Sequence, residues 1–161
     1  MEEVLFINAC VRGGEQSRTL WLARTFLKEY QKNNPESRVT ELNLMQMELN
    51  CMMNRVFQER EELILRKELE DKTFDLARQF AKADKIVIAA PFWEFSFPAV
   101  LKVYIENVSV AGISFEYVDN GSRGLCKADK LLFVTTRGGY YSEGFAATLE
   151  MGSRYLEALC V

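Results

Sequence analysis

The fold of this chain is decided by Lys85-Ile-Val-Ile-Ala-Ala-Pro-Phe-Trp-Glu-Phe-Ser-Phe-Pro98, an apolar run that leads directly into an aromatic turn between two prolines. Residues 86–90 show no polar alternation, so both faces of this strand are expected to be covered, as in a parallel sheet. Three aromatic residues then follow Pro91 within five positions. Ligands of open α/β sheets bind beyond the carboxyl ends of the strands. An aromatic turn at this place predicts a site for a flat, conjugated molecule.

Further strands and helices surround this stretch. Residues 4–7 and 131–134 are short apolar runs typical of buried strands, whereas residues 38–44 alternate as an edge strand with one wet face would. The alternation of strands with helices predicts a parallel α/β layer fold. Helices are expected from a cap at Ser17 to Asn33, from about Gln58 to Lys82, over 99–110 and from near Glu143 to the last residue, with a hairpin at 113–124 built on an Asn-Gly turn.

Composition narrows the chemistry of this 161-residue chain. It is 48% hydrophobic with a net charge of −3, which suits one domain over residues 1–161 and disfavours a nucleic-acid partner. There is no membrane-spanning run and no secretory leader, so we expect no membrane partner. The four cysteines lie far apart, without metal spacing, and histidine is absent. We therefore expect a cytoplasmic protein without a metal, and without a nucleophile activated by histidine.

The predicted fourth strand raises a question about the edge of the sheet. Residues 131–134 are apolar throughout, like an interior strand, yet no further strand is predicted after them. A bare edge of this kind would invite pairing with another chain. Either another subunit covers the edge, or a terminal fifth strand and helix are missing. We expect the second, because apolar residues continue up to Val161 without a helix stop signal.

The loop after the first strand has the features of an anion site. It ends at the start of a helix, where free N–H groups and the helix dipole favour negative charge. Ser17 and Thr19 add hydroxyl groups, and Arg12 and Arg18 add positive charge. A capped helix after an ordinary polar loop would look the same, so this loop alone leaves both interpretations open.

Two other loops are predicted at the same edge of the sheet. The aromatic turn could flank a ligand, or its rings could instead cover a helix end or an interface. After the fourth strand, Gly138 and Gly139 would permit a close approach of backbone to ligand, although a tight turn would use them equally well.

Taken together, these loops resemble the FMN-dependent NADH-azoreductases and NAD(P)H:quinone oxidoreductases. The resemblance covers essentially the whole chain. It implies a flavodoxin-like fold, a doubly wound parallel sheet of strand order 2-1-3-4. It also implies an FMN cofactor, a homodimer, and two-electron transfer from NADH or NADPH to quinones or azo compounds in a ping-pong cycle. The motifs that carry it are Leu5-Phe-Ile-Asn8, Ser17-Arg-Thr-Leu20, Ala90-Pro-Phe-Trp-Glu-Phe95, Lys102-Val-Tyr-Ile-Glu-Asn107, Ala111-Gly-Ile-Ser-Phe-Glu-Tyr117, Asn120-Gly-Ser-Arg-Gly-Leu125 and Thr135-Thr-Arg-Gly-Gly139.

The resemblance also assigns cofactor-binding residues to three groups. The first loop would hold the FMN phosphate, the aromatic turn would border the ribityl chain and the ring, and the last loop would contact the ring. No catalytic acid or base is implied, because the flavin itself carries the chemistry. The three groups are Cys10, Ser17, Arg18 and Thr19; Pro91, Phe92, Trp93, Glu94 and Phe95; and Thr136, Arg137, Gly138 and Gly139.

Three positions depart from the family pattern. Ala9 and Cys10 stand where serines are common, so phosphate contacts there would depend more on backbone amides. Glu94 replaces the usual asparagine of the aromatic turn. A carboxylate about 6 Å from an anionic reduced flavin would cost roughly 3 kcal/mol at an effective dielectric constant near 20. This would lower the flavin potential, unless Glu94 points to solvent.

Other functions stay open at this point. A flavodoxin-like carrier would share the fold and FMN but pass single electrons to protein partners, and a shortened family member could be inactive. A low-molecular-weight tyrosine phosphatase also has a cysteine after its first strand. That family requires Cys-x5-Arg, and here Gln16 takes the arginine position, with Arg18 two residues late.

Overall fold

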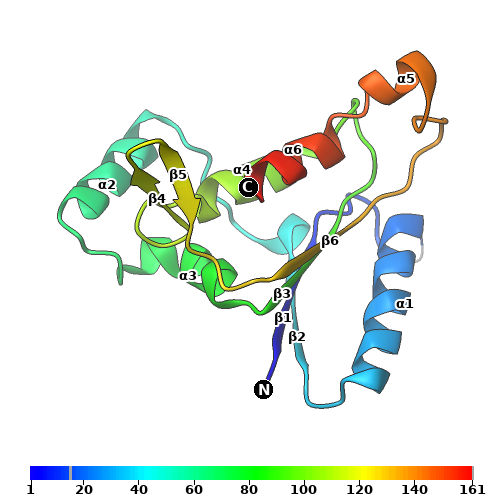
Figure 1. Ribbon diagram of the computed structural model, residues 1–161, viewed down its shortest axis with the longest axis horizontal. Coiled ribbons are helices and arrows are strands. Elements are labelled where there is room, and N and C mark those ends of the chain that lie inside the picture. Colours follow the sequence, from blue (N-terminus) through cyan, green and yellow to red (C-terminus); the bar gives the residue numbers. More distant parts are fainter. Residues whose placement is uncertain (15, 161) are drawn as a thin grey trace.

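A four-stranded parallel sheet forms the centre of the computed structural model, which describes residues 1–14 and 16–160 (Figure 1). Its strand order is β2-β1-β3-β6, which confirms the predicted order. Ile88 of β3 lies in register with Ile7 of β1 on one side and with Phe133 of β6 on the other. The strands are β1 (Glu3–Asn8), β2 (Arg38–Asn43), β3 (Lys85–Ala89) and β6 (Lys130–Val134).

Both faces of β1 and β3 are buried, as the apolar runs predict. Alternate residues of β1 point to opposite faces of the sheet. Leu5 and Ile7 pack with α4 (Ala99–Val108), while Val4 and Phe6 pack with α1 (Arg18–Asn33). Figure 1 shows α1 on one side of the sheet and α3 (Asp75–Lys82) with α4 on the other. Burial of each such side chain stabilises the fold by about 1.5–3 kcal/mol.

The single helix predicted from Gln58 to Lys82 is wrong. The structure has α2 (Asn54–Leu65), then the short 3₁₀ turn η2 (Lys72–Phe74), and then α3. At the end of α2, Lys67 adopts a left-handed φ of 60°, its N–H bonds to the Ile64 carbonyl, and the Glu68 N–H bonds to the Leu63 carbonyl. This is a Schellman motif, which usually carries glycine at its left-handed position. Because lysine occupies this position, the sequence gives no signal for the end of the helix.

The last predicted helix starts where expected but is broken. α5 (Gly144–Thr148) and α6 (Gly152–Leu159) are separated by residues 149–151. The Met151 N–H bonds to the Phe95 carbonyl instead of continuing α5, and a Glu150 side-chain oxygen accepts from the Ser153 N–H to start α6. α6 ends at Leu159 with Cys160 as its C-cap, so the predicted continuation of the helix is wrong at Cys160, and Val161 lies outside the described residues.

Two smaller features complete the fold. The predicted hairpin is present as β4 (Phe115–Val118) and β5 (Gly121–Gly124), but its two turn residues are Asp119 and Asn120, because Val118 pairs with Gly121. A second 3₁₀ turn, η1 (Leu44–Gln46), follows β2. In the described part of the chain, β6 pairs only with β3, so it is an edge strand. The prediction of a buried strand at residues 131–134 is therefore wrong for most of its length, because Leu132 is exposed and only Val134 is buried.

Candidate cofactor site

Three loops converge at the carboxyl edge of the sheet, after β1, β3 and β6. Backbone hydrogen bonds join them in series. The Ala9 N–H donates to the Ala89 carbonyl at 2.8 Å, the Ala90 N–H to Val134 at 3.1 Å, and the Phe92 N–H to Thr136 at 3.1 Å. The structure therefore brings together the three predicted groups of site residues, although they are far apart in the sequence.

The loop after β1 presents the start of α1. The Ser17 hydroxyl accepts a hydrogen bond from the Leu20 N–H at 3.2 Å, which confirms Ser17 as the helix cap. Helix geometry leaves the N–H groups of Arg18 and Thr19 without a carbonyl four residues earlier in the helix. These two amides and the Ser17 hydroxyl are donors suited to a phosphate. The Arg12 and Arg18 side chains are exposed on the same loop.

Thr19 differs from its predicted role. Its side chain is buried, and its hydroxyl lies 2.7 Å from the Thr136 hydroxyl. The Thr19 side chain thus joins the loops after β1 and β6. Sequence reasoning missed this pair because the two threonines are 117 positions apart.

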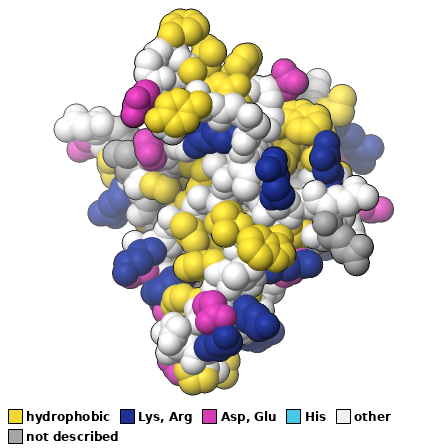
Figure 2. Space-filling view, turned by 90° about the vertical axis from the view of Figure 1, so that its right-hand side faces the viewer, with side chains coloured by type: hydrophobic (Ala, Val, Ile, Leu, Met, Phe, Trp, Pro, Cys, Tyr) yellow, Lys and Arg dark blue, Asp and Glu magenta, His cyan; other side chains and the backbone are white. Residues whose placement is uncertain are grey.

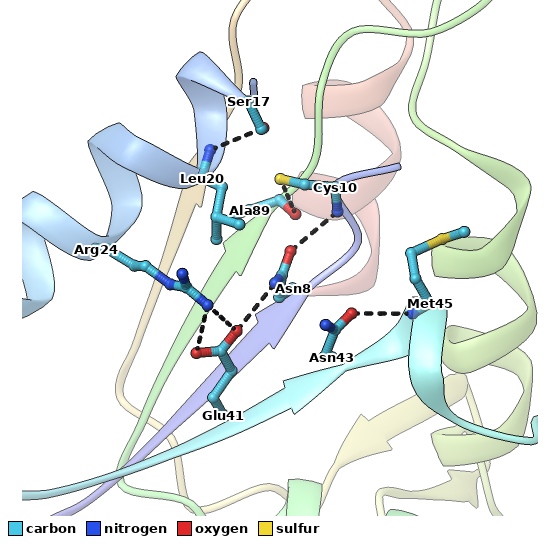
Figure 3. A network of polar contacts seen from close by, with 9 residues as sticks. All are labelled: Asn8, Cys10, Ser17, Leu20, Arg24, Glu41, Asn43, Met45 and Ala89. Atoms are coloured by element: carbon cyan, nitrogen blue, oxygen red, sulfur yellow. Dashed lines mark hydrogen bonds and ion pairs between the residues drawn. The ribbon is translucent and has the colours of Figure 1, made fainter. Parts of the chain in front are cut away.

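The surroundings of Cys10 indicate a role in packing. Its thiol is buried and lies 3.6 Å from the Ala89 carbonyl, to which it donates (Figure 3). Burial raises the pKa of the Cys10 thiol, with opposing contributions from Ser17 and Arg24 that are smaller. A phosphatase nucleophile needs a thiolate, which requires a lowered pKa, so this environment argues against the phosphatase interpretation.

A polar network that sequence reasoning missed fixes the first loop (Figure 3). Asn8, buried at the end of β1, accepts from the Cys10 N–H at 3.1 Å and donates to Glu41 of β2 at 2.9 Å. Arg24 of α1 holds the same carboxylate with contacts of 3.0 and 3.2 Å. The network ties β1, β2 and α1 together immediately beneath the predicted phosphate site. The only sequence signal was an asparagine at the end of an apolar run.

The aromatic turn is a tight two-residue hairpin. The Trp93 N–H donates to the Ser96 carbonyl at 3.0 Å, and the Ser96 N–H donates back to the Trp93 carbonyl at 2.8 Å. Glu94 and Phe95 between them have left-handed φ angles of 46° and 64°. Positive φ at both central residues defines a type I′ turn, which normally carries asparagine or glycine. Trp93 and Phe95 are each 48% exposed, so the turn presents aromatic surface at the site.

The loop after β6 supports the aromatic turn from the side. Arg137 lies over the Phe92 ring at 5.7 Å, and the Tyr141 and Phe92 ring centres are 4.5 Å apart. A Cβ on Gly139 would meet the Tyr141 ring at 2.8 Å, whereas one on Gly138 would meet nothing within 4 Å. Gly139 is therefore needed for packing, and Gly138 faces open space at the site.

The site as a whole fits a molecule with an anionic end and a flat ring. The amides at the start of α1 lie at one end, and the exposed aromatic turn lies beside Gly138 at the other. The buried Thr135 hydroxyl, at the start of the last loop, has no hydrogen-bond partner in the described residues. Such a group is expected to be satisfied by a bound molecule or by water. An FMN-sized nucleotide matches this set of donors and surfaces.

Comparison with known proteins first identifies the class. The family model for the flavodoxin-like fold matches residues 2–160, so the chain belongs to the flavodoxin-like proteins. An azoreductase from Bacillus anthracis str. Sterne has a similar structure, with a TM-score of 0.88 and 32% identity over 99% of this chain and 80% of its own.

Sequence relatives then narrow the family. The chain is 40% identical to FMN-dependent NADH:quinone oxidoreductase 2 of Clostridium acetobutylicum, over 99% of this chain and 79% of that protein. It is 38% identical to FMN-dependent NADH:quinone oxidoreductase 3 of Halalkalibacterium halodurans, over 99% of this chain and 80% of the relative. The chain is a member of the FMN-dependent NADH:quinone oxidoreductase family, which confirms the resemblance inferred from its motifs.

Proposed function

We propose that this protein is an FMN-dependent oxidoreductase that moves two electrons from NADH or NADPH to quinones or azo compounds in a ping-pong cycle. Its relatives named as FMN-dependent NADH:quinone oxidoreductases and its similarity to an azoreductase structure support this proposal. The observation that carries it is the junction at Thr136. The Thr136 hydroxyl contacts Thr19 beside the anion-binding amides, and its carbonyl accepts from Phe92 of the aromatic turn.

In this proposal each loop binds one part of FMN. The Ser17 hydroxyl and the Arg18 and Thr19 amides hold the phosphate, with Cys10 contributing only backbone and packing. The turn, Pro91 through Phe95, borders the ribityl chain and the ring. Thr136, Arg137, Gly138 and Gly139 line the other side of the ring. Each hydrogen bond to the charged phosphate would contribute about 1.5–3 kcal/mol.

Bound FMN supplies the acceptance and donation of a hydride equivalent, and the protein's residues bind and orient the reactants. The chain has no histidine, and the buried Cys10 thiol has a raised pKa, which keeps it protonated at neutral pH. These residues therefore provide positioning and electrostatics instead of an acid or a nucleophile. Trp93 and Phe95, half exposed at the edge of the site, offer a surface on which a flat quinone or azo dye can stack.

We also propose a cytoplasmic homodimer. Its exposed apolar surface supports the dimer, because Figure 2 shows hydrophobic side chains over the face that carries α1 and α5, where Trp21 is 66% and Phe145 79% exposed. Four free cysteines suit a reducing compartment. Within the described residues, no helix has the length and apolarity needed to cross a membrane.

An absorbance spectrum followed by an activity assay tests the function. We expect the purified protein to be yellow, to release FMN on denaturation, and to oxidise NADH when menadione is added. A colourless protein that takes up no added FMN would contradict the cofactor. A protein that binds FMN but does not oxidise NADH would point instead to a single-electron carrier.

A further inference from the structure

The type I′ turn at the site is held in a conformation that its own residues disfavour. Glu94 and Phe95 are neither glycine nor asparagine, yet both have left-handed φ angles. The Cβ of such a residue lies too close to the following carbonyl oxygen, so the left-handed conformation is disfavoured. Strained backbone of this kind persists only where surrounding structure fixes it.

The start of α6 makes the contacts that fix this turn. The Met151 N–H donates to the carbonyl of Phe95 at 2.9 Å. Gly152 is buried, and a Cβ added to it would lie 3.3 Å from Glu150 Oε1, 3.4 Å from the Ser96 carbonyl carbon and 3.5 Å from the Phe97 ring. The two contacts with the turn are of ordinary van der Waals length, so the tight contact is the one with the Glu150 carboxylate.

The break between α5 and α6 makes this contact possible. In a continuous helix, the Met151 N–H would bond to the carbonyl four residues earlier, at Ala147. Because the helix is interrupted, that N–H points to the turn instead. Glu150, itself buried, accepts from the Ser153 N–H at 3.2 Å and so fixes the start of α6.

We propose that residues 150–153 are a positioning element that clamps the aromatic turn in the conformation that receives the flavin ring. The Met151 N–H holds the turn, and Gly152 leaves room for the Glu150 carboxylate that fixes the start of α6. The inference rests on the proposed function, because it takes the turn at Trp93–Ser96 to border the cofactor. If the clamp fixes the turn and FMN binds to the turn, FMN must in return stabilise the clamp, since coupling between two sites is reciprocal.

The first test compares Gly152→Ala with Gly124→Ala. Gly124 is in β5, away from the site, and an added Cβ there meets nothing within 4 Å. Alanine is the better helix former, so Gly152→Ala should not lower the melting temperature of the FMN-free protein through helix propensity. We expect its Kd for FMN to rise about three- to tenfold and the visible circular dichroism of the bound flavin to change. Gly124→Ala should keep both at their original values.

An unchanged Kd and flavin spectrum in Gly152→Ala would overturn the clamp. So would a loss of melting temperature in the FMN-free variant large enough to account for its weaker binding, because that indicates a general structural role.

A second measurement needs no variant. Amide hydrogen exchange of the unmodified protein, with and without FMN, should slow at both Trp93 and Met151 when FMN binds. Slowing at Trp93 alone would overturn the clamp and leave the placement of the cofactor intact. If neither amide slows while FMN binds, both the placement of the ring and the clamp are wrong.

Discussion

Glu94 is the residue that most distinguishes this site, because it places a carboxylate in the turn proposed to border the flavin. The side chain is exposed, so water and salt screen its charge more than they would in a buried site. The roughly 3 kcal/mol expected for a carboxylate 6 Å from a negative flavin is therefore an upper bound. Screening does not change the direction of the effect of Glu94 on the flavin potential. A negative charge in the turn disfavours an electron-rich cofactor.

We predict that Glu94→Gln raises the two-electron potential of bound FMN by on the order of 10–30 mV, an effect that shrinks with added salt. A redox titration with a reference dye measures it. Glu36→Gln is the matched control, since it removes the same charge from an exposed loop that precedes β2, at the opposite end of the sheet. Equal potentials in the two variants would show that the Glu94 carboxylate does not act on the flavin.

At the scale of elements, sequence patterns predicted the sheet better than the helix ends. Three strands were recognisable as short apolar runs and β2 by its alternation of polar and apolar residues, and the cap at Ser17 had a hydroxyl of the right kind. The end of α2 was not predicted, because Lys67 occupies the left-handed cap position at which glycine is the usual residue. The break before α6 depends on a hydrogen bond to Phe95, a contact between distant segments that no local pattern contains.

The left-handed cap leads to a prediction about stability. Lys67→Gly should raise the free energy of unfolding by about 0.5–1 kcal/mol, because glycine adopts this φ without strain. Arg66→Gly, one position earlier, should lower it by a similar amount, since Arg66 has an ordinary right-handed conformation with a φ of −79°. Urea unfolding measures both. A change of the same sign in the two variants would contradict the assigned role of Lys67.

At the scale of the whole molecule, the two ends of the sheet carry different kinds of residues. The carboxyl end carries the candidate site, whereas the amino end carries charge pairs that join strands. Asp84 accepts from the Glu3 N–H at 2.9 Å and pairs with Lys127 at 2.6 Å. The hydrogen bond from Glu3, followed by the one from Lys127, lowers the pKa of the Asp84 carboxyl.

The lowered pKa of Asp84 makes the stability of the fold depend on pH. A carboxyl whose pKa is lower in the folded state stabilises the fold above its unfolded pKa, and that stabilisation is lost as the pH falls through the folded pKa. We predict that Asp84→Asn is less stable than the original protein at pH 7, and that the difference narrows below the ordinary carboxyl range. Urea unfolding at pH 7 and pH 3 tests it, with Glu36→Gln as a surface control. If the unfolding free energies of the two proteins differ by the same amount at both pH values, the role of Asp84 is contradicted.

The sequence could predict that the three loops lie at the same edge of the sheet, but not the contacts between them. Parallel strands place their carboxyl ends at one edge, so the three loops had to be neighbours. The contacts that turn neighbours into one site, Thr19 with Thr136 and Arg137 over Phe92, come from packing and not from any local motif. The same holds for the strained turn, since neither Glu94 nor Phe95 signals a left-handed backbone.

The most direct test of the site is a titration of the isotope-labelled, FMN-free protein with FMN, followed by the amide signals of Arg18, Trp93 and Gly138 in a two-dimensional NMR spectrum. These residues represent the phosphate end, the aromatic turn and the last loop. We predict that all three signals move together and reach completion at one FMN per chain, with a single Kd. Signals that stay in place, or that follow different binding curves, would contradict the account of one flavin held by all three loops.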